Sequence, residues 1–133
     1  MQFSLMNNQG YFFSSYDQNS VTVSQNREGM DPIVQSFSTN IIITHNTIAE
    51  CNYQSLADFD LFDQIKTNKI DLIIFGINEY SKLYHHPTLI KLNQLKIGYE
   101  LMSIPATCRS FNYLSAENRN PLAVILFSYN HDA

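Results

Sequence analysis

The sequence predicts a single α/β domain with a mixed sheet, in which N-terminal antiparallel hairpins precede a parallel β-α-β-α-β part. The 133-residue chain has the size of one domain and can bury a core without disulfides or metal. In residues 1–65, short β-type runs are separated by Asn, Gly and Ser, which is typical of hairpins. In residues 66–133, buried-strand patterns alternate with helical stripes, which indicates parallel strands joined by crossover helices.

The first half is expected to form hairpins from four short strands. The runs with β-forming composition are 11–13, 21–23, 33–37 and 41–44. The segment from Arg27 to Pro32 and the pair His45-Asn46 have the composition of turns. The run Asn40–Thr44 is continuously apolar in its centre rather than alternating, which predicts a strand covered on both faces.

A helix is predicted from Leu56 to about Thr67. Ser55 can cap its first turn, and Asp58 lies where a negative charge complements the helix dipole. One face of this helix is apolar and contains Leu61, Phe62 and Ile65.

The second half is predicted to contain two successive βαβ units. A buried strand, Ile70–Phe75, ends at Gly76, and Pro87 then stands at a first helical position. The remaining expected elements are a helix with the apolar stripe Leu89, Ile90, Leu92 and Leu95, a strand Tyr99–Ile104, a helix over about 106–118 that begins at Pro105, and a strand Pro121–Ser128.

Composition and charge restrict the partners of the protein. The net charge is −4 with eight Lys and Arg residues, which excludes the basic face that duplex nucleic acid requires. Residues 1–65 carry one base and seven acids, a net charge of −6, and residues 66–133 carry seven bases and five acids, a net charge of +2. We interpret this asymmetry as a solvated surface; the alternative is an acidic face for a basic partner.

Cysteine usage and the chain start predict the compartment. Cys51 and Cys108 are 57 positions apart and form no C-x-x-C pair, which favours a reducing environment. Residues 1–13 contain no Lys or Arg and no long apolar run, unlike a signal or transit peptide. The longest apolar runs are too short to cross a bilayer. We therefore expect a cytoplasmic protein with no integral membrane segment.

Two strand ends are the predicted location of any site, because ligands of such sheets bind outside the carboxyl ends of the strands. These are the segments 76–79 and 104–109. Cys108 is expected in the first turn of a helix, beside Arg109. A helix N-terminus and a neighbouring cation each lower the pKa of a thiol. With His85 or His86 as a base, Cys108 is a candidate nucleophile. The interpretation that we favour is that Cys108 packs against the sheet and that Cys51 is inert.

A second group of charged residues consists of Arg109, Glu117 and Arg119. They either form an anion site at a helix start or make ion pairs that fix the helix to a loop, and we favour ion pairs. The spacing of the four His residues predicts no metal site. The sequence contains no dinucleotide, phosphate-loop or nucleophile-elbow motif, so we expect no cofactor.

Residues 71–127 resemble the family named domain of unknown function 498, which includes a mitochondrial assembly factor for respiratory complex I and the adipogenesis-associated domain protein. The family pattern is a strand ending in G-T-G, a loop with H-P or F-P, a helix, and a long segment containing M-D-T and A-A-C-R. The matching residues here are Gly76, His86-Pro87, Met102, Ala106, Cys108, Arg109, Asn112, Leu114, Glu117 and Arg119. Asn78 replaces the second glycine of G-T-G, and Ser103 replaces the acid of M-D-T, which weakens any acid–base role.

The resemblance implies a compact α/β fold and no established reaction. The pocket residues that it and the strand ends suggest are Gly76, Asn78, Cys108, Arg109, Asn112, Glu117 and Arg119. Our leading hypothesis is a non-catalytic binding or assembly module with a protein partner, which assists assembly of a respiratory or other membrane complex. The alternative is a small-ligand binder or enzyme that uses the Gly76/Cys108/Arg109 crevice. A third possibility is a purely structural role as a homo-oligomer.

Overall fold

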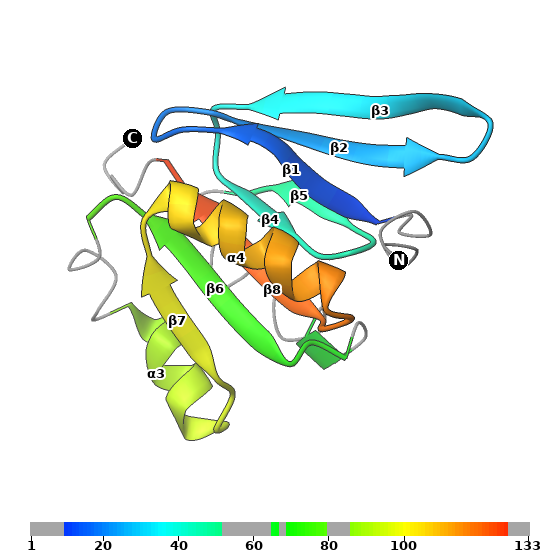
Figure 1. Ribbon diagram of the computed structural model, residues 1–133. Helices are drawn as coiled ribbons and strands as arrows, with labels where there is room; N and C mark the ends of the chain where they lie inside the picture. The colour runs from blue at the N-terminus through cyan, green and yellow to red at the C-terminus, as the bar shows by residue number, and fades with distance from the viewer. Residues whose placement is uncertain (1–9, 52–64, 67–68, 80–85, 128–133) are drawn as a thin grey trace.

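The computed structural model describes residues 10–51, 65–66, 69–79 and 86–127, and within these ranges it contains two sheets and two helices (Figure 1). The strands of the first sheet are β1 (Tyr11–Tyr16), β2 (Val21–Arg27) and β3 (Met30–Phe37). Those of the second are β4 (Ile41–Ile43), β5 (Ile48–Glu50), β6 (Leu72–Ile77), β7 (Tyr99–Met102) and β8 (Pro121–Leu126). The helices are α3 (Pro87–Gln94) and α4 (Ile104–Ala116).

The first sheet is an antiparallel meander in the order β1-β2-β3. The second has the order β5-β4-β8-β6-β7, and it is mixed because β6 pairs parallel with β7 and β8 whereas β4 pairs antiparallel with β5 and β8. The predicted class, antiparallel hairpins followed by a parallel β-α-β-α-β part, is confirmed. The position of β8 between β4 and β6 is a non-local pairing on which the local sequence pattern gives no information.

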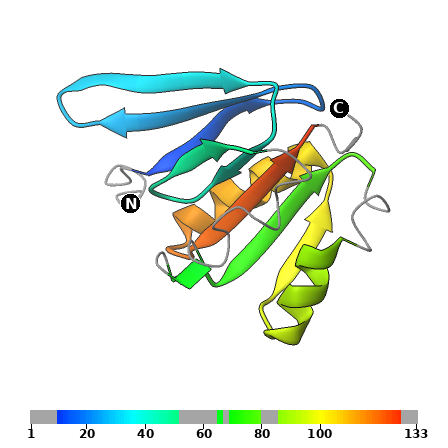
Figure 2. The ribbon, with the colours of Figure 1, turned by 180° about the vertical axis from the view of Figure 1, so that it is seen from behind.

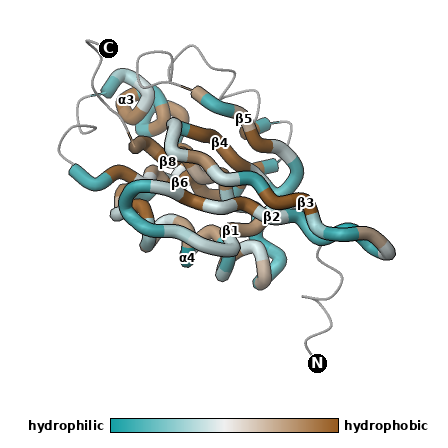
Figure 3. Tube along the Cα trace, turned by 90° about the horizontal axis from the view of Figure 1, so that it is seen from above, coloured by the Kyte–Doolittle hydropathy of each residue, from teal (hydrophilic) through white to brown (hydrophobic). Residues whose placement is uncertain are grey.

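The five-stranded sheet is covered on both faces. Helix α4 and the three-stranded sheet cover one face, and α3 lies on the other (Figures 1 and 2). Ile41 and Ile43 belong to the apolar cluster on the α4 side, and Ile42 belongs to the cluster on the α3 side. The predicted two-sided burial of this run is therefore confirmed. Figure 3 shows apolar β4 and β8 in the middle of the molecule. Burial of each large apolar side chain there contributes about 1.5–3 kcal/mol to the stability of the fold.

The turn predicted between Arg27 and Pro32 is wrong in extent. Strand β2 continues to Arg27 and β3 begins at Met30, so that the connection is the pair Glu28-Gly29. Gly29 has a φ of 73°, which glycine adopts without the steric cost that a Cβ imposes. Pro32 lies within β3, which forms an edge of the first sheet, where proline is tolerated. Strand β5 is absent from the predicted elements, because three residues, one half-exposed and two exposed, carry little periodicity.

Several predictions in the second half are corrected. Strand β7 ends at Met102 rather than Ile104, and β8 ends at Leu126 rather than Ser128. Gly76 lies inside β6 rather than after it, because the strand continues to Ile77. Of the predicted stripe on α3, Leu89 and Leu92 are buried, whereas Ile90 and Leu95 are 51% and 50% exposed. Helix α4 begins at Ile104, two residues before the expected Ala106, because Ser103 caps it and Pro105 occupies its second position.

The helix predicted over 56–67 lies outside the described residues except for Ile65 and Lys66, which are helical. Helices α3 and α4 contain 8 and 13 residues. Among the described residues, no helix is long and apolar enough to span a membrane.

Candidate functional site

A groove of about 370 Å³ opens between helix α4 and the edge strand β7, and we name it the Arg109 groove. It forms because α4 packs over β6 and β8 and leaves β7 outside its cover (Figure 1). The groove is lined by Leu72 and Ile74 of β6, Glu100 and Met102 of β7, and Arg109, Ser110, Tyr113 and Leu114 of α4.

Strand alternation places the β7 residues of the groove. Successive side chains of a strand point to opposite faces, so Glu100 and Met102 share the α4 side. Tyr99 and Leu101 pack against the apolar cluster on the α3 side. The hydroxyl of Ser110 on α4 lies 3.6 Å from Met102 Sδ and donates a hydrogen bond to it, which joins the two walls of the groove.

Arg109 and Tyr113 form the exposed wall of the groove. They are four residues apart on α4 and therefore lie on the same helix face. Arg109 is exposed, and its guanidinium makes no hydrogen bond or ion pair within the described part of the chain. Tyr113 is 66% exposed. The wall therefore offers a free cation and an aromatic ring above an apolar floor.

Gly76 does not line this groove. A Cβ on Gly76 would lie 2.7 Å from Thr107 Oγ1 and 2.9 Å from Thr107 Cβ, so this glycine permits close approach of α4 to β6. Thr107 is fully buried, and its hydroxyl donates to Ser103 O at 2.9 Å. The space beside Gly76 is thus filled by helix packing.

Cys108 points into the core rather than toward a crevice. It is fully buried in the cluster that contains Ile104 and Phe111, in the second turn of α4. Burial raises the pKa of the Cys108 thiol to about 12, although the positive charge of Arg109 acts in the opposite direction. The buried position gives no support to a Cys108 thiolate, and the thiol packs in the core against the sheet, as in the interpretation that we favour. Burial also raises the pKa of Cys51 to about 12.

The proposed Cys–His pair does not form with His86. Cys108 belongs to the cluster on the α4 side, whereas His86 caps α3 on the opposite face of the sheet. Nδ1 of His86 accepts a hydrogen bond from Thr88 N at 3.1 Å, and His85 lies outside the described residues. Within the described ranges, no three His, Cys, Asp or Glu side chains are arranged to hold a metal ion.

Asn112 of α4 and Asn78, which follows β6, bind the backbone of β1 and of the connection between β1 and β2. Asn112 Oδ1 accepts from Phe13 N at 2.9 Å and Asn112 Nδ2 donates to Phe13 O at 2.8 Å. Asn78 Nδ2 donates to Gln18 O at 3.2 Å in the connection between β1 and β2. Both amides hold the three-stranded sheet in place and neither lines the groove.

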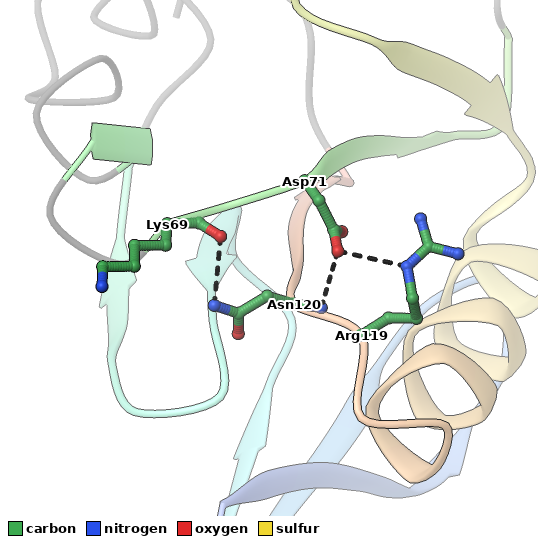
Figure 4. A network of polar contacts seen from close by, with 4 residues as sticks. All are labelled: Lys69, Asp71, Arg119 and Asn120. Atoms are coloured by element: carbon green, nitrogen blue, oxygen red, sulfur yellow. Dashed lines mark hydrogen bonds and ion pairs between the residues drawn. The ribbon is translucent and has the colours of Figure 1, made fainter.

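Arg119 and Glu117 lie where α4 ends, near the amino ends of β6 and β8, away from the predicted carboxyl-end crevice. Arg119 Nε is 3.1 Å from Asp71 Oδ2, and the same oxygen accepts from Asn120 N at 3.4 Å (Figure 4). Both partners of the ion pair are exposed, so its contribution to stability is only about 0–1 kcal/mol. Glu117 is the C-terminal cap residue of α4. Arg119 therefore forms the kind of ion pair that we favour from the sequence, one that ties the end of a helix to a loop.

Of the seven residues proposed for the pocket, only Arg109 lines the described groove. Its neighbours Glu100, Met102 and Tyr113 were not among them. The spacing of four between Arg109 and Tyr113, and the alternation within Tyr99–Met102, are the signals that indicate these neighbours.

The fold and groove define a small α/β protein in which a three-stranded sheet and a helix cover one face of a mixed sheet. The chain belongs to the DUF498/DUF598 family of proteins of unknown function, whose model matches residues 13–126. The resemblance found on residues 71–127 is thereby confirmed at the level of the family and extended into the N-terminal half. No curated protein matches the chain.

Among the solved structures that share the fold are those of a Xanthomonas and a Bordetella protein. The NMR structure of a Xanthomonas campestris protein is 18% identical with a TM-score of 0.63, covering 90% of this chain and 86% of that one. The crystal structure of a Bordetella parapertussis protein is 20% identical with a TM-score of 0.65, covering 90% of this chain and 98% of that one. Both are structural genomics targets, and at this identity they show the fold alone.

Proposed function

We propose that the protein is a binding module that recognises a partner protein through the Arg109 groove and catalyses no reaction on it. The observation that carries the proposal is the unpaired guanidinium of Arg109 beside the 66% exposed ring of Tyr113, above the apolar side chains of Leu72 and Ile74. Arg, Tyr and Met are enriched at protein interfaces, and Arg and Tyr supply many of the residues that dominate binding energy.

The family resemblance suggests which class of partner protein should be tested first. The family includes an assembly factor for a respiratory complex, so we propose that this chain assists assembly of a respiratory or other membrane complex. A subunit of such a complex is then the expected partner.

The alternative of a small-ligand site retains only Arg109 from the Gly76/Cys108/Arg109 crevice. A volume of about 370 Å³ lies within the range of small-molecule pockets. Gly76 and Cys108 are covered by the packing of α4, so a ligand at Arg109 would contact Glu100 and Tyr113 in their place.

The test is affinity capture from cells that make the protein, with the full chain as bait. We compare the natural chain with Arg109→Glu, which reverses the groove cation, and with Arg119→Gln, which removes the exposed arginine at the far end of α4. We expect a partner that the natural chain and Arg119→Gln recover equally and that Arg109→Glu recovers at least about tenfold less. Recovery of no partner above background, or equal recovery by Arg109→Glu, would refute the proposal.

A further inference from the structure

The outer edge of β7 carries free backbone groups. Ile73 lies opposite Tyr99 in the parallel ladder, and its N–H donates to Gly98 O at 3.1 Å. In this pattern the backbone N–H and C=O groups of Gly98 and Glu100 point toward β6. Those of Tyr99 and Leu101 therefore point away from β6. Within the described part of the chain no strand lies beyond β7, and neither residue has a further hydrogen bond.

The two edges of the three-stranded sheet are protected in ways that β7 lacks. On β1, Asn112 binds both backbone groups of Phe13. On β3, Pro32 has no N–H, and the guanidinium of Arg27 donates to the carbonyl of Asp31 at 2.6 and 2.9 Å. Strand β5, the other edge of the five-stranded sheet, contains three residues against four in β7. Proteins use such devices to prevent unwanted strand pairing, and an edge without them is available for pairing.

The two faces of β7 differ in chemistry. Tyr99 and Leu101 extend the apolar cluster that contains Leu89 and Leu92 of α3. Glu100 and Met102 line the Arg109 groove on the other face. A strand added beside β7 would place alternate side chains on these two faces, because the side-chain period of a strand is two residues.

We propose that β7 receives an extended segment of the partner protein as an additional outer strand of the five-stranded sheet. The segment alternates apolar side chains beside Tyr99 and Leu101 with polar side chains beside the groove. A carboxylate of the segment pairs with Arg109, which has no other partner, and a basic or neutral side chain lies next to Glu100. This proposal rests on the proposed function and deepens it by naming the docking edge and the chemistry of the segment.

The test uses two substitutions at one position. Leu101→Pro removes the outward N–H that the added strand needs, and edge strands tolerate proline where the N–H faces solvent. Leu101→Ala shortens the same side chain and keeps the N–H, so it is the matched control. The probe is a set of ten-residue synthetic peptides that tile the protein identified in the capture experiment, titrated against the full-length chain.

We expect a peptide with the alternating pattern to bind both the natural chain and Leu101→Ala. The same peptide should bind Leu101→Pro at least about tenfold more weakly than it binds Leu101→Ala. In the natural chain, saturation with this peptide should slow amide hydrogen exchange at Tyr99 and Leu101 by at least about tenfold. This measurement does not depend on the folding of a variant.

Three results would overturn the addition of a partner strand to β7 without refuting binding of the partner through the Arg109 groove. The first is equal affinity of Leu101→Pro and Leu101→Ala for the partner. The second is unchanged exchange at Tyr99 and Leu101 in the complex, as a small ligand in the groove would give. The third is a natural chain that pairs with a second copy through β7, seen as a dimer by light scattering that Leu101→Pro abolishes. Recovery of no partner at all would instead refute the proposed function.

Discussion

The side-chain amide of Asn112 on α4 binds the backbone N–H and C=O of Phe13 on β1, although the two residues are 99 positions apart. The amide thereby replaces a neighbouring strand at this edge. The rings of Phe13 and Phe111 meet edge to face with centroids 5.4 Å apart, so polar and apolar contacts fix the same junction between the first sheet and α4.

The substitution Asn112→Asp should weaken the contact between Asn112 and the backbone of Phe13. The carboxylate can still accept from Phe13 N, but it cannot donate to Phe13 O, and it places a negative oxygen against that carbonyl. Stability at pH 7 should fall by about 1–3 kcal/mol in urea unfolding. The loss should shrink as the pH falls through about 4, because the protonated carboxyl can donate. Asn93→Asp, at an exposed position of α3, is the control. An equal loss of stability in this variant would contradict a stabilising role of the Asn112–Phe13 hydrogen bonds.

Gly76→Ala should destabilise the fold by about 1–3 kcal/mol, because the new Cβ overlaps Thr107 and forces α4 away from β6. The matched control is Gly98→Ala, where the nearest atom to the added Cβ is Leu72 Cδ1 at 3.9 Å, an ordinary contact. Thermal unfolding of both variants checks the prediction. Equal melting temperatures would mean that α4 can shift away from β6 without loss.

Burial of Cys108 predicts a loss of stability at high pH. The folded thiol has a pKa of about 12, whereas an exposed thiol titrates near 8.5. Because the unfolded chain releases this proton first, the contribution of the Cys108 thiol to stability should be constant below about pH 8 and decrease above it, by up to about 1.4 kcal/mol per pH unit. Cys108→Ala should show a shallower decrease between pH 8.5 and 10.5 in denaturant titrations. An unchanged slope would indicate that the thiol is accessible in the folded state.

The sequence pattern predicts the order of elements from β6 to β8 well, because each element there has its own period. The continuous run at Ile41–Ile43 correctly predicts burial on both faces. Strand β5 has no such signal, since its three residues are half-exposed or exposed.

The candidate site was less predictable for a geometric reason. The start of α4 at Ile104 rather than Ala106 places Cys108 in the second turn, where it faces the core, and leaves Arg109 exposed. Glu100 reaches the groove only because α4 crosses β6 and β8 and misses β7, an outcome of strand order. Strand order depends on pairing between segments distant in the chain, which no local period encodes.

The end of α3 should be improved by Lys96→Gly. Lys96 has a φ of 59°, and the following N–H, of Ile97, donates to Leu92 O at 3.0 Å, as in a helix end that favours glycine. Because a Cβ is disfavoured in this left-handed region, the substitution should raise stability by about 0.5–1 kcal/mol after the extra flexibility of the unfolded chain is subtracted. Asn118→Gly provides the comparison, since Asn118 ends α4 with a φ of 64° and Arg119 N donates to Leu114 O at 2.8 Å. Asparagine tolerates this conformation better than lysine, so Asn118→Gly should gain less in urea unfolding, and an equal or larger gain there would contradict the assignment of strain to Lys96.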